Sequence, residues 1–306
     1  MRIGVYAISK NESKHVEEWL KCVSEADVVC VTDTGSEDDT VDKLLKSGTV
    51  ISYYREPFRF DKARNFSLEQ AKACNVDIWV SLDLDEMPEK GWRKKLEAAA
   101  TDGAQGWRIT IDNGNNSFQN IRAHRAEGWT WKHACHEVLM GPGPIGDAGF
   151  KVVHHQDLGK PRNYLPLLEL DVKENPEDGR AWHYLGREYM YLGRWEDATN
   201  AFDEAMAYDE WAEQRSRSGV FSSRCEWHLG NVRWARDYAW EAVQDFGSRE
   251  AWVHLAWLLD QQGDPTAAIA AENALKIKKH GLYPSEPGAW SRNTENWLRK
   301  LVEVGA

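Results

Sequence analysis

The fold is decided by one stretch, residues 77–86, which reads Asp77-Ile78-Trp79-Val80-Ser81-Leu82-Asp83-Leu84-Asp85-Glu86. An apolar run that is typical of a buried strand ends there in three carboxylates within four residues. Crowding like charges costs free energy unless a cation compensates them. The strand end is therefore either the start of a solvated loop or a seat for a divalent metal ion.

The bulk composition is that of a globular protein. The 306 residues are 42% hydrophobic and 28% charged, which is enough chain for two domains. A formal net charge of −11 disfavours passive attraction to nucleic acid or anionic membrane, because both need clustered Lys and Arg. We expect no membrane span and no signal peptide. Five cysteines without a C-x-x-C pair favour reduced thiols and a cytoplasmic location.

Residues 1–83 alternate short apolar runs with amphipathic stretches. This pattern predicts a mostly parallel sheet, whose ligands bind outside the carboxyl ends of the strands. Polar segments 9–12, 33–36 and 83–86 end three of these strands, so we expect them to meet in one crevice. The predicted strands are Ile3–Ile8, Asp27–Thr32, Thr49–Tyr54 and Ile78–Leu82, and the predicted helices are Lys14–Ser24, Asp38–Lys46 and Asp61–Cys74.

Residues 106–156 carry a different pattern of short strands and loops, in which Gly141-Pro142-Gly143-Pro144 is a strong turn signal. The predicted strands are Gly106–Ile111, Ile121–His124, Trp129–Cys135 and Phe150–His155. We therefore assign residues 1–160 to an α/β domain.

From about residue 163 the pattern becomes helical and repeats, so residues 161–306 form a second, all-α domain. Small and aromatic residues recur at the tetratricopeptide spacing. The best copy uses Trp182, Leu185, Gly186, Tyr189, Gly193, Ala198, Phe202 and Ala205. A second copy starts at Trp252, a degraded copy lies between them, and Trp290–Val304 reads as a capping helix.

Two side chains upstream of the acidic stretch are candidates for binding a nucleotide. Asp33 follows the second strand and could accept from a base N–H or a ribose hydroxyl, although an Asx-turn or a helix N-cap is an equal alternative. Arg64 lies near a helix start and suits a phosphate. Its alternative is a surface arginine packed on Phe58 or Phe60.

Asp83 and Asp85 are the sharper signal. Residues two apart on an extended segment point the same way, so one could hold a ribose and the other a divalent ion. Hard oxygen ligands suit Mg²⁺ or Mn²⁺, which would bridge a diphosphate. Glu86 is left as a local hydrogen-bond partner or a helix-start charge.

Together these segments resemble the inverting family-2 glycosyltransferases of GT-A fold, in particular a subgroup with C-terminal tetratricopeptide repeats. The residues that carry the resemblance are Lys10-Asn11-Glu12, Asp33–Asp38, Ala63-Arg64-Asn65 and Leu82–Glu86. The resemblance implies a Rossmann-like GT-A catalytic domain followed by a tetratricopeptide-like domain. It places Asp33 at the base, Asp83 at the ribose, Asp85 on the metal and Arg64 near the diphosphate, with Glu12 and Ile8 near the nucleoside.

The same resemblance extends to residues 135–155. Val152-Val153-His154-His155 looks like a strand whose histidine completes the metal site, with His154 the better match and His155 the second choice; a surface histidine pair is the alternative. Glu137 could be the general base that deprotonates an acceptor, or could simply pair with His133 or Lys132. Asp112 is the rival base.

Trp107, Trp129 and Trp131 could stack on a sugar, but in a chain with sixteen tryptophans they fit a core better. The resulting hypothesis is a glycosyltransferase that uses Mn²⁺ or Mg²⁺ and a nucleoside-diphosphate sugar, most simply a UDP-sugar. The acceptor is open between a peptide or protein docked on the repeats, a glycan and a modified nucleic acid, and the repeats could also hold a homodimer. A tetratricopeptide adaptor with a degenerate catalytic domain is the rival; a nucleotidyltransferase would need a glycine-rich basic loop that residues 9–12 lack.

Overall fold

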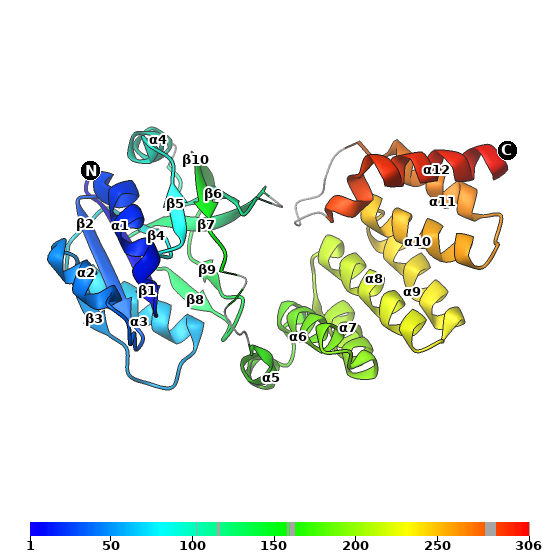
Figure 1. Cartoon of the computed structure of the whole chain (residues 1–306), viewed down its shortest axis with the longest axis horizontal. Helices are drawn as coiled ribbons and strands as arrows, with labels where there is room; N and C mark the ends of the chain where they lie inside the picture. Colours follow the sequence, from blue (N-terminus) through cyan, green and yellow to red (C-terminus); the bar gives the residue numbers. More distant parts are fainter. Residues whose placement is uncertain (102, 115–116, 158, 160–162, 279–285, 306) are drawn as a thin grey trace. The chain divides into compact units, whose positions relative to one another are not determined.

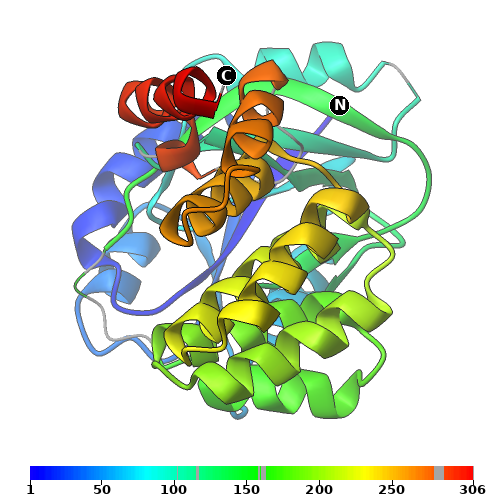
Figure 2. The ribbon, with the colours of Figure 1, turned by 90° about the vertical axis from the view of Figure 1, so that its right-hand side faces the viewer.

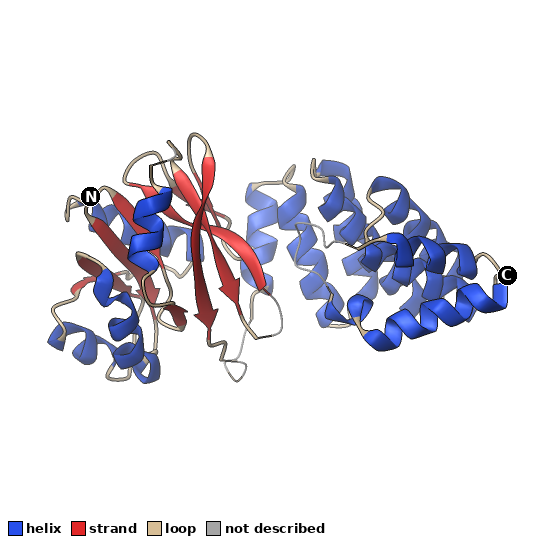
Figure 3. Ribbon diagram, turned by 90° about the horizontal axis from the view of Figure 1, so that it is seen from above, coloured by secondary structure: helices blue, strands red, loops and turns tan. Residues whose placement is uncertain are grey.

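The strands belong to the first of two units into which the chain divides, Met1–Arg162 and Asn163–Ala306. The fold is known from a computed structural model that describes residues 1–101, 103–114, 117–157, 159, 163–278 and 286–305. Within these ranges the second unit contains helices and loops only (Figure 3). The predicted domain boundary between residues 160 and 161 lies outside the described residues.

Four neighbouring parallel strands bring the polar segments to one edge of the sheet. The strand order is β3-β2-β1-β4-β7-β6-β10-β5 (Figure 1). The register places Ser9 opposite Asp33, and Asp33 opposite Tyr53, so neighbouring strands end level with each other. The parallel strands are β1 (Ile3–Ser9), β2 (Val28–Asp33), β3 (Val50–Tyr53) and β4 (Ile78–Ser81).

The rest of the sheet mixes directions. β7 (Ser117–Arg125) runs antiparallel to β4 and to β6 (Gly106–Asp112). β10 (Ile145–His154) is parallel to β6, and the short β5 (Glu86–Pro88) is antiparallel to β10. A separate antiparallel ribbon consists of β8 (Thr130–Lys132) and β9 (Val138–Met140).

Both faces of the sheet are covered, which explains why β1 and β4 are apolar on both sides. Alternate residues such as Ile3, Ile78 and Val80 pack with α1 (Ser13–Cys22), α2 (Thr40–Lys46) and α4 (Trp92–Ala99). Tyr6 and Trp79 face the other way, against α3 (Phe60–Lys72) and the β8–β9 ribbon. The first unit therefore has three layers. The sheet lies between α1, α2 and α4 on one face and α3 with the β8–β9 ribbon on the other.

The second unit is a series of helix pairs that lie side by side (Figure 2). Gly186 allows one pair to approach, because a Cβ there would lie 2.6 Å from the Phe202 ring. No helix among the described residues has the length and apolar character to cross a membrane. The helices are α5 (Leu165–Glu174), α6 (Gly179–Tyr191), α7 (Trp195–Tyr208), α8 (Ala212–His228), α9 (Val232–Asp245), α10 (Arg249–Gln261), α11 (Ala267–Lys276) and α12 (Arg292–Gly305).

The predicted fold class, a mostly parallel α/β sheet followed by a helical repeat region, is confirmed. Three elements were not predicted: α4, β5 and β9. The predicted strand over Trp129–Cys135 is wrong at its end, because His133 has a φ of 76° and interrupts extended backbone. The predicted strand at Phe150 begins earlier, at Ile145, directly after the Gly-Pro turn.

A chain of buried hydrogen bonds crosses the core beneath the strand ends. Trp131 Nε1–H donates to the Tyr6 hydroxyl (2.9 Å), which lies 3.2 Å from His124 Nε2. His124 Nδ1 lies 2.7 Å from the carbonyl of Arg125, so this nitrogen carries the proton and Nε2 accepts. Burial lowers the pKa of His124 to about 4 and raises the pKa of Tyr6 to about 12.

The buried hydrogen bonds that link Trp131, Tyr6 and His124 predict that the protein loses stability in mild acid. His124 stays neutral in the fold, so its contribution is complete above pH 6.5 and falls as the pH approaches 4. Between pH 7 and pH 4.5, the free energy of unfolding should fall by about 2–3 kcal/mol more in the wild type than in His124→Gln. Urea unfolding monitored by hydrogen exchange of β7 peptides measures this difference; equal pH dependence in the two proteins would contradict it.

Candidate active site at the carboxyl edge of the parallel strands

The loops that follow β1 and β2 are tied together at the carboxyl edge. The Asn11 N–H donates to Ser36 Oγ (3.0 Å), and the Glu37 N–H donates to Asn11 Oδ1 (2.8 Å). Glu12 precedes α1, and its N–H donates to Thr40 Oγ1. Two of the three predicted polar segments are thus in direct contact, and Ile8 lies half-buried at the end of β1 beside them.

Asp33 forms the Asx-turn that was one of its two predicted roles. Its carboxylate accepts from the Gly35 N–H (3.0 Å) and the Ser36 N–H (3.1 Å), and Gly35 has the positive φ of 108°. Arg55 Nη1 lies 3.6 Å from Oδ2. The turn fixes the carboxylate at the strand end, where contact with a base stays a prediction.

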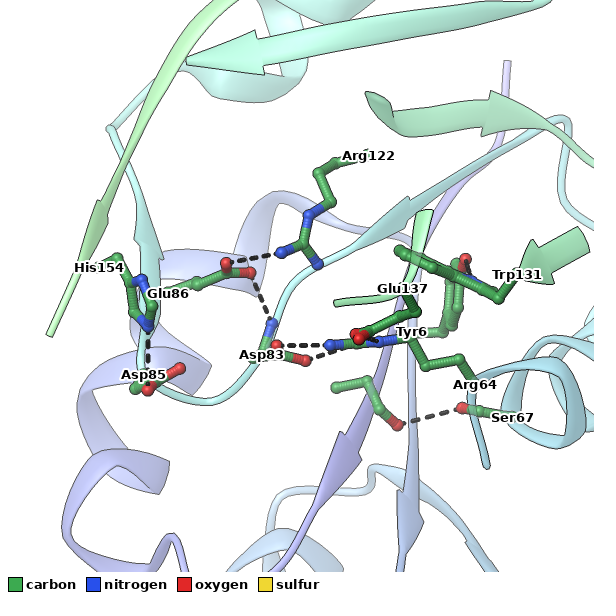
Figure 4. Close-up of polar contacts among 11 residues, drawn as sticks. Tyr6, Arg64, Ser67, Asp83, Asp85, Glu86, Arg122, Trp131, Glu137 and His154 are labelled. Atoms are coloured by element: carbon green, nitrogen blue, oxygen red, sulfur yellow. Dashed lines mark hydrogen bonds and ion pairs between the residues drawn. The ribbon is translucent and has the colours of Figure 1, made fainter. Parts of the chain in front are cut away.

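Arg64 is buried, so its alternative as a surface arginine is wrong. Its side chain is only 4% exposed. Nη1 and Nη2 donate to the two oxygens of Asp83 at 2.8 and 2.7 Å, and Nε donates to Glu137 Oε1 at 2.6 Å (Figure 4). One guanidinium therefore joins helix α3, the end of β4 and the segment before β9.

Trp131 supports this guanidinium from the ribbon. The Arg64 guanidinium carbon lies 4.9 Å from the centre of the Trp131 ring. Trp131 is 3% exposed, and Trp107 and Trp129 are also buried, which agrees with the core role preferred for all three. Trp131 also donates to Tyr6, so it connects the charged site to the buried hydrogen bonds that end at His124.

The ion pair controls the ionisation of both partners. Burial raises the pKa of Asp83, but the Arg64 guanidinium outweighs it and brings this pKa to about 2. Burial lowers the pKa of Arg64, and the Asp83 and Glu137 carboxylates raise it well above its ordinary value. Both groups are therefore charged at neutral pH.

Asp85 and His154 form the part of the site that could hold a metal ion. His154 Nε2 lies 3.3 Å from Asp85 Oδ2, at the end of β10. Burial lowers the pKa of His154, and its hydrogen bond with Asp85 raises it above the ordinary value. His155 donates its backbone N–H to the Asp85 carbonyl, while its ring stacks on His15 (6.5 Å between centres).

A carboxylate oxygen and an imidazole nitrogen at this separation fit a divalent cation, with Mn²⁺ more tolerant of the nitrogen than Mg²⁺. Among the described residues, no group of three or more His, Cys, Asp and Glu side chains could hold a metal alone. Two protein ligands leave most positions for phosphate oxygens and water, as is usual for cations bound with phosphates.

Glu86 is buried and has a partner that sequence reasoning missed. Its Oε2 accepts from the Asp83 N–H (2.9 Å), which confirms a local hydrogen-bond role, and its Oε1 accepts from Arg122 Nη2 (3.1 Å). It starts β5 and not a helix. Burial raises the pKa of Glu86 despite the Arg122 guanidinium.

The site carries excess negative charge. Arg64 and Arg122 face four carboxylates when His154 is neutral, which leaves two uncompensated negative charges. The carboxylates are Asp83, Asp85, Glu86 and Glu137. A divalent cation would balance this excess, which is a second reason to expect one here.

The two candidate bases lie in different places. Glu137 pairs with Arg64, which was not among its predicted partners. Asp112 is the last residue of β6, opposite Val153 of β10, and its Oδ1 accepts from the Gly114 N–H (2.9 Å). Both therefore lie near the carboxyl edge, Glu137 in contact with the ion-pair network and Asp112 one strand beyond β7.

The known proteins described below each resemble a part of the chain. Residues 179–210 match the tetratricopeptide repeat family. No curated protein matches the chain. The structure of MamA shows 17% identity over 46% of this chain and 84% of its own, with a TM-score of 0.35.

Glucosyl-3-phosphoglycerate synthase from Mycobacterium tuberculosis, in complex with Mn²⁺, UDP and glucosyl-3-phosphoglycerate, shows 22% identity over 37% of this chain, with a TM-score of 0.32. The same synthase with Mg²⁺ and UDP shows 24% identity over 36%, with a TM-score of 0.31. The matches span 45% and 43% of those chains. These TM-scores are too low to transfer a function.

The buried ion pair predicts a large stability effect. Arg64→Gln leaves Asp83 and Glu137 without their cation and should lower the free energy of unfolding by about 3–5 kcal/mol. Arg64→Gln/Asp83→Asn should recover part of this loss, because one buried charge is removed.

The matched control is Lys72→Gln, which breaks an exposed pair with Glu69 on the same helix and should cost at most about 0.5 kcal/mol. Urea unfolding measures all three proteins. If Arg64→Gln lowered the free energy of unfolding no more than Lys72→Gln does, this would contradict an ion pair that stabilises the fold.

Proposed function

We propose that the protein is a metal-dependent, inverting glycosyltransferase that moves a sugar from a nucleoside diphosphate, most simply UDP, to an acceptor. One observation carries the proposal. The carboxyl edge of the parallel strands brings the pair between buried Arg64 and partly exposed Asp83 next to Asp85 and His154, which could share a divalent cation. Crevices at this edge are where open α/β sheets bind ligands.

In this proposal the donor lies across the ends of β1, β2 and β4. Asp33, Glu12 and Ile8 contact the nucleoside. Asp83 accepts from the ribose while Arg64 holds its carboxylate in one orientation, and Arg64 also places positive charge near the diphosphate. Because Asp83 and Arg64 are already fixed by each other, little side-chain entropy is lost when the donor binds.

Asp85 and His154 would hold the cation, Mn²⁺ or Mg²⁺. When bound, such an ion neutralises charge that develops on the leaving diphosphate. The protein's own contribution is to hold the Asp85 carboxylate and the His154 nitrogen 3.3 Å apart, so that both are directed toward the same point.

Inversion in a single displacement requires a base that removes the proton of the acceptor hydroxyl. Glu137 is our first candidate and Asp112 the second. A general base contributes roughly 10²–10⁴ in rate. If Glu137 is the base, turnover by Glu137→Gln should be lower than turnover by Asp112→Asn by about that factor. Glu137→Gln also alters the contact with Arg64, and donor affinity measured in parallel separates the two effects.

The helical repeats supply the remaining part of the proposal. Arrays of this kind bind extended chains, so a peptide or protein acceptor fits better than a small molecule, and a homodimer contact is the alternative use. A cytoplasmic location agrees with five cysteines that form no disulfide. The competing function is a tetratricopeptide adaptor, favoured by the family match at residues 179–210.

The proposal predicts a loss of turnover without a loss of fold. Asp85→Ala should lower sugar transfer or donor hydrolysis at least about 100-fold, because charge on the leaving group is no longer compensated. Its unfolding midpoint should stay close to that of the wild type, since the ion pair that the Asp85 side chain forms within the described residues is with the half-buried His154.

The assay is mass spectrometry of candidate acceptors incubated with a panel of nucleotide sugars and Mn²⁺, with release of UDP measured in parallel. Asp157→Ala, which removes a more exposed carboxylate in the same unit, is the control. Normal turnover by Asp85→Ala with Mn²⁺ present would contradict the mechanism. Absence of nucleotide binding and turnover in the wild type would favour the adaptor.

A further inference from the structure

Arg122 occupies an irregular position in the sheet. Along β6 and β7, Trp107 pairs with Ala123 and Arg108 pairs with Ile121, so Arg122 is the extra residue of a β-bulge. Bulges are frequent beside active sites, where they redirect a side chain. Here the bulge directs Arg122 to the candidate site, where its guanidinium contacts Glu86 (Figure 4).

Only part of the Arg122 guanidinium is used by the protein. Nη2 donates to Glu86 Oε1 at 3.1 Å, and the guanidinium carbon lies 5.7 Å from the centre of the Trp131 ring. Nη1 is buried, and within the described part of the chain no atom accepts a hydrogen bond from it. A buried donor without an acceptor is costly, so such groups in native proteins call for an explanation.

Pairing with Glu86 does not explain the whole side chain. That contact uses one nitrogen, and a lysine would satisfy it. The guanidinium presents a second N–H group in a fixed geometry that suits an oxyanion. The Arg64 guanidinium also lies against the Trp131 ring, so both arginines contact the same side chain.

Hydrogen-bond partners distinguish the two arginines. Arg64 pairs with two carboxylates, whereas the ion pair of Arg122 within the described residues is with Glu86. A diphosphate held by a cation at Asp85 and His154 would present oxygens that accept hydrogen bonds from arginine. Arg122 Nη1 is a buried donor without an acceptor in the described part of the chain.

We infer that Arg122 is a ligand-binding residue whose Nη1 donates to a phosphate oxygen of the donor's diphosphate. This inference rests on the proposed function and deepens it. The β-bulge places the guanidinium, Glu86 orients it through Nη2, and the phosphate supplies the acceptor that Nη1 does not have among the described residues. Arg122 lies within β7 and does not belong to the polar segments that end the parallel strands.

The test measures the binding of UDP, inorganic pyrophosphate and uridine by titration calorimetry in the presence of Mn²⁺. Arg122→Gln should weaken UDP and pyrophosphate at least about tenfold, because a charge-assisted hydrogen bond is lost, and should leave uridine within about twofold. The control is Arg108→Gln, which removes an exposed arginine from the neighbouring strand and should leave all three affinities unchanged.

A second variant separates ligand binding from support of Glu86. Arg122→Gln/Glu86→Gln removes both charges of the ion pair, so no buried carboxylate is left unpaired. If Arg122 contacts the phosphate, the double variant keeps the tenfold loss for UDP. Recovery of wild-type UDP affinity in the double variant would show that Arg122 serves only Glu86 and would overturn the inference.

The remaining outcomes are also decisive. UDP affinity of Arg122→Gln equal to that of Arg108→Gln would overturn the assignment while leaving the proposed function intact. An equal loss for uridine and UDP would mean that the variant disturbs the nucleoside site, which also overturns it. A wild type that binds none of the three ligands would overturn both the assignment and the proposed function.

Discussion

The bidentate pair between Arg64 and Asp83 is the contact on which the candidate site depends. It joins helix α3 to the end of β4, and through Glu137 to the segment before β9. A guanidinium that is 4% exposed cannot be left without anions, so these elements have to stay together. Trp131 lies against this guanidinium and donates to Tyr6, which carries the constraint into the core.

Each carboxylate of the acidic stretch that follows β4 contacts a side chain from a different element. Asp83 pairs with Arg64, Asp85 lies beside His154, and Glu86 pairs with Arg122. The three cationic or ionisable partners come from α3, β10 and β7, which are far apart in the sequence. The apolar half of the same stretch, Ile78–Leu82, packs in the core and fixes where the carboxylates lie. Core packing and site geometry are thus set by β4 and the residues that directly follow it.

The parallel half of the fold could be predicted because its strands are buried on both faces and read as apolar runs. The strand-end carboxylates, Arg64 and His154 followed from spacing and from the family resemblance. The contacts among them could not be predicted: the Glu137 partner depends on the path of residues 133–137, where His133 and His136 have positive φ. Arg122 could not be predicted as a site residue, because the alternation of apolar and polar residues along a strand does not reveal a β-bulge. β5 has only three residues, and it begins with a charged residue, Glu86, that pairs with His154 of β10.

In the proposed function, Asp85 and His154 hold a divalent cation together with a nucleoside diphosphate. Pulsed electron paramagnetic resonance of the protein with Mn²⁺ and UDP tests it most directly. We expect a nitrogen coupling from the His154 imidazole and phosphorus couplings from UDP on the same Mn²⁺, with the nitrogen coupling lost in His154→Gln and kept in His155→Gln. A spectrum of Mn²⁺ bound to UDP without any imidazole nitrogen, or of fully hydrated Mn²⁺, would contradict it.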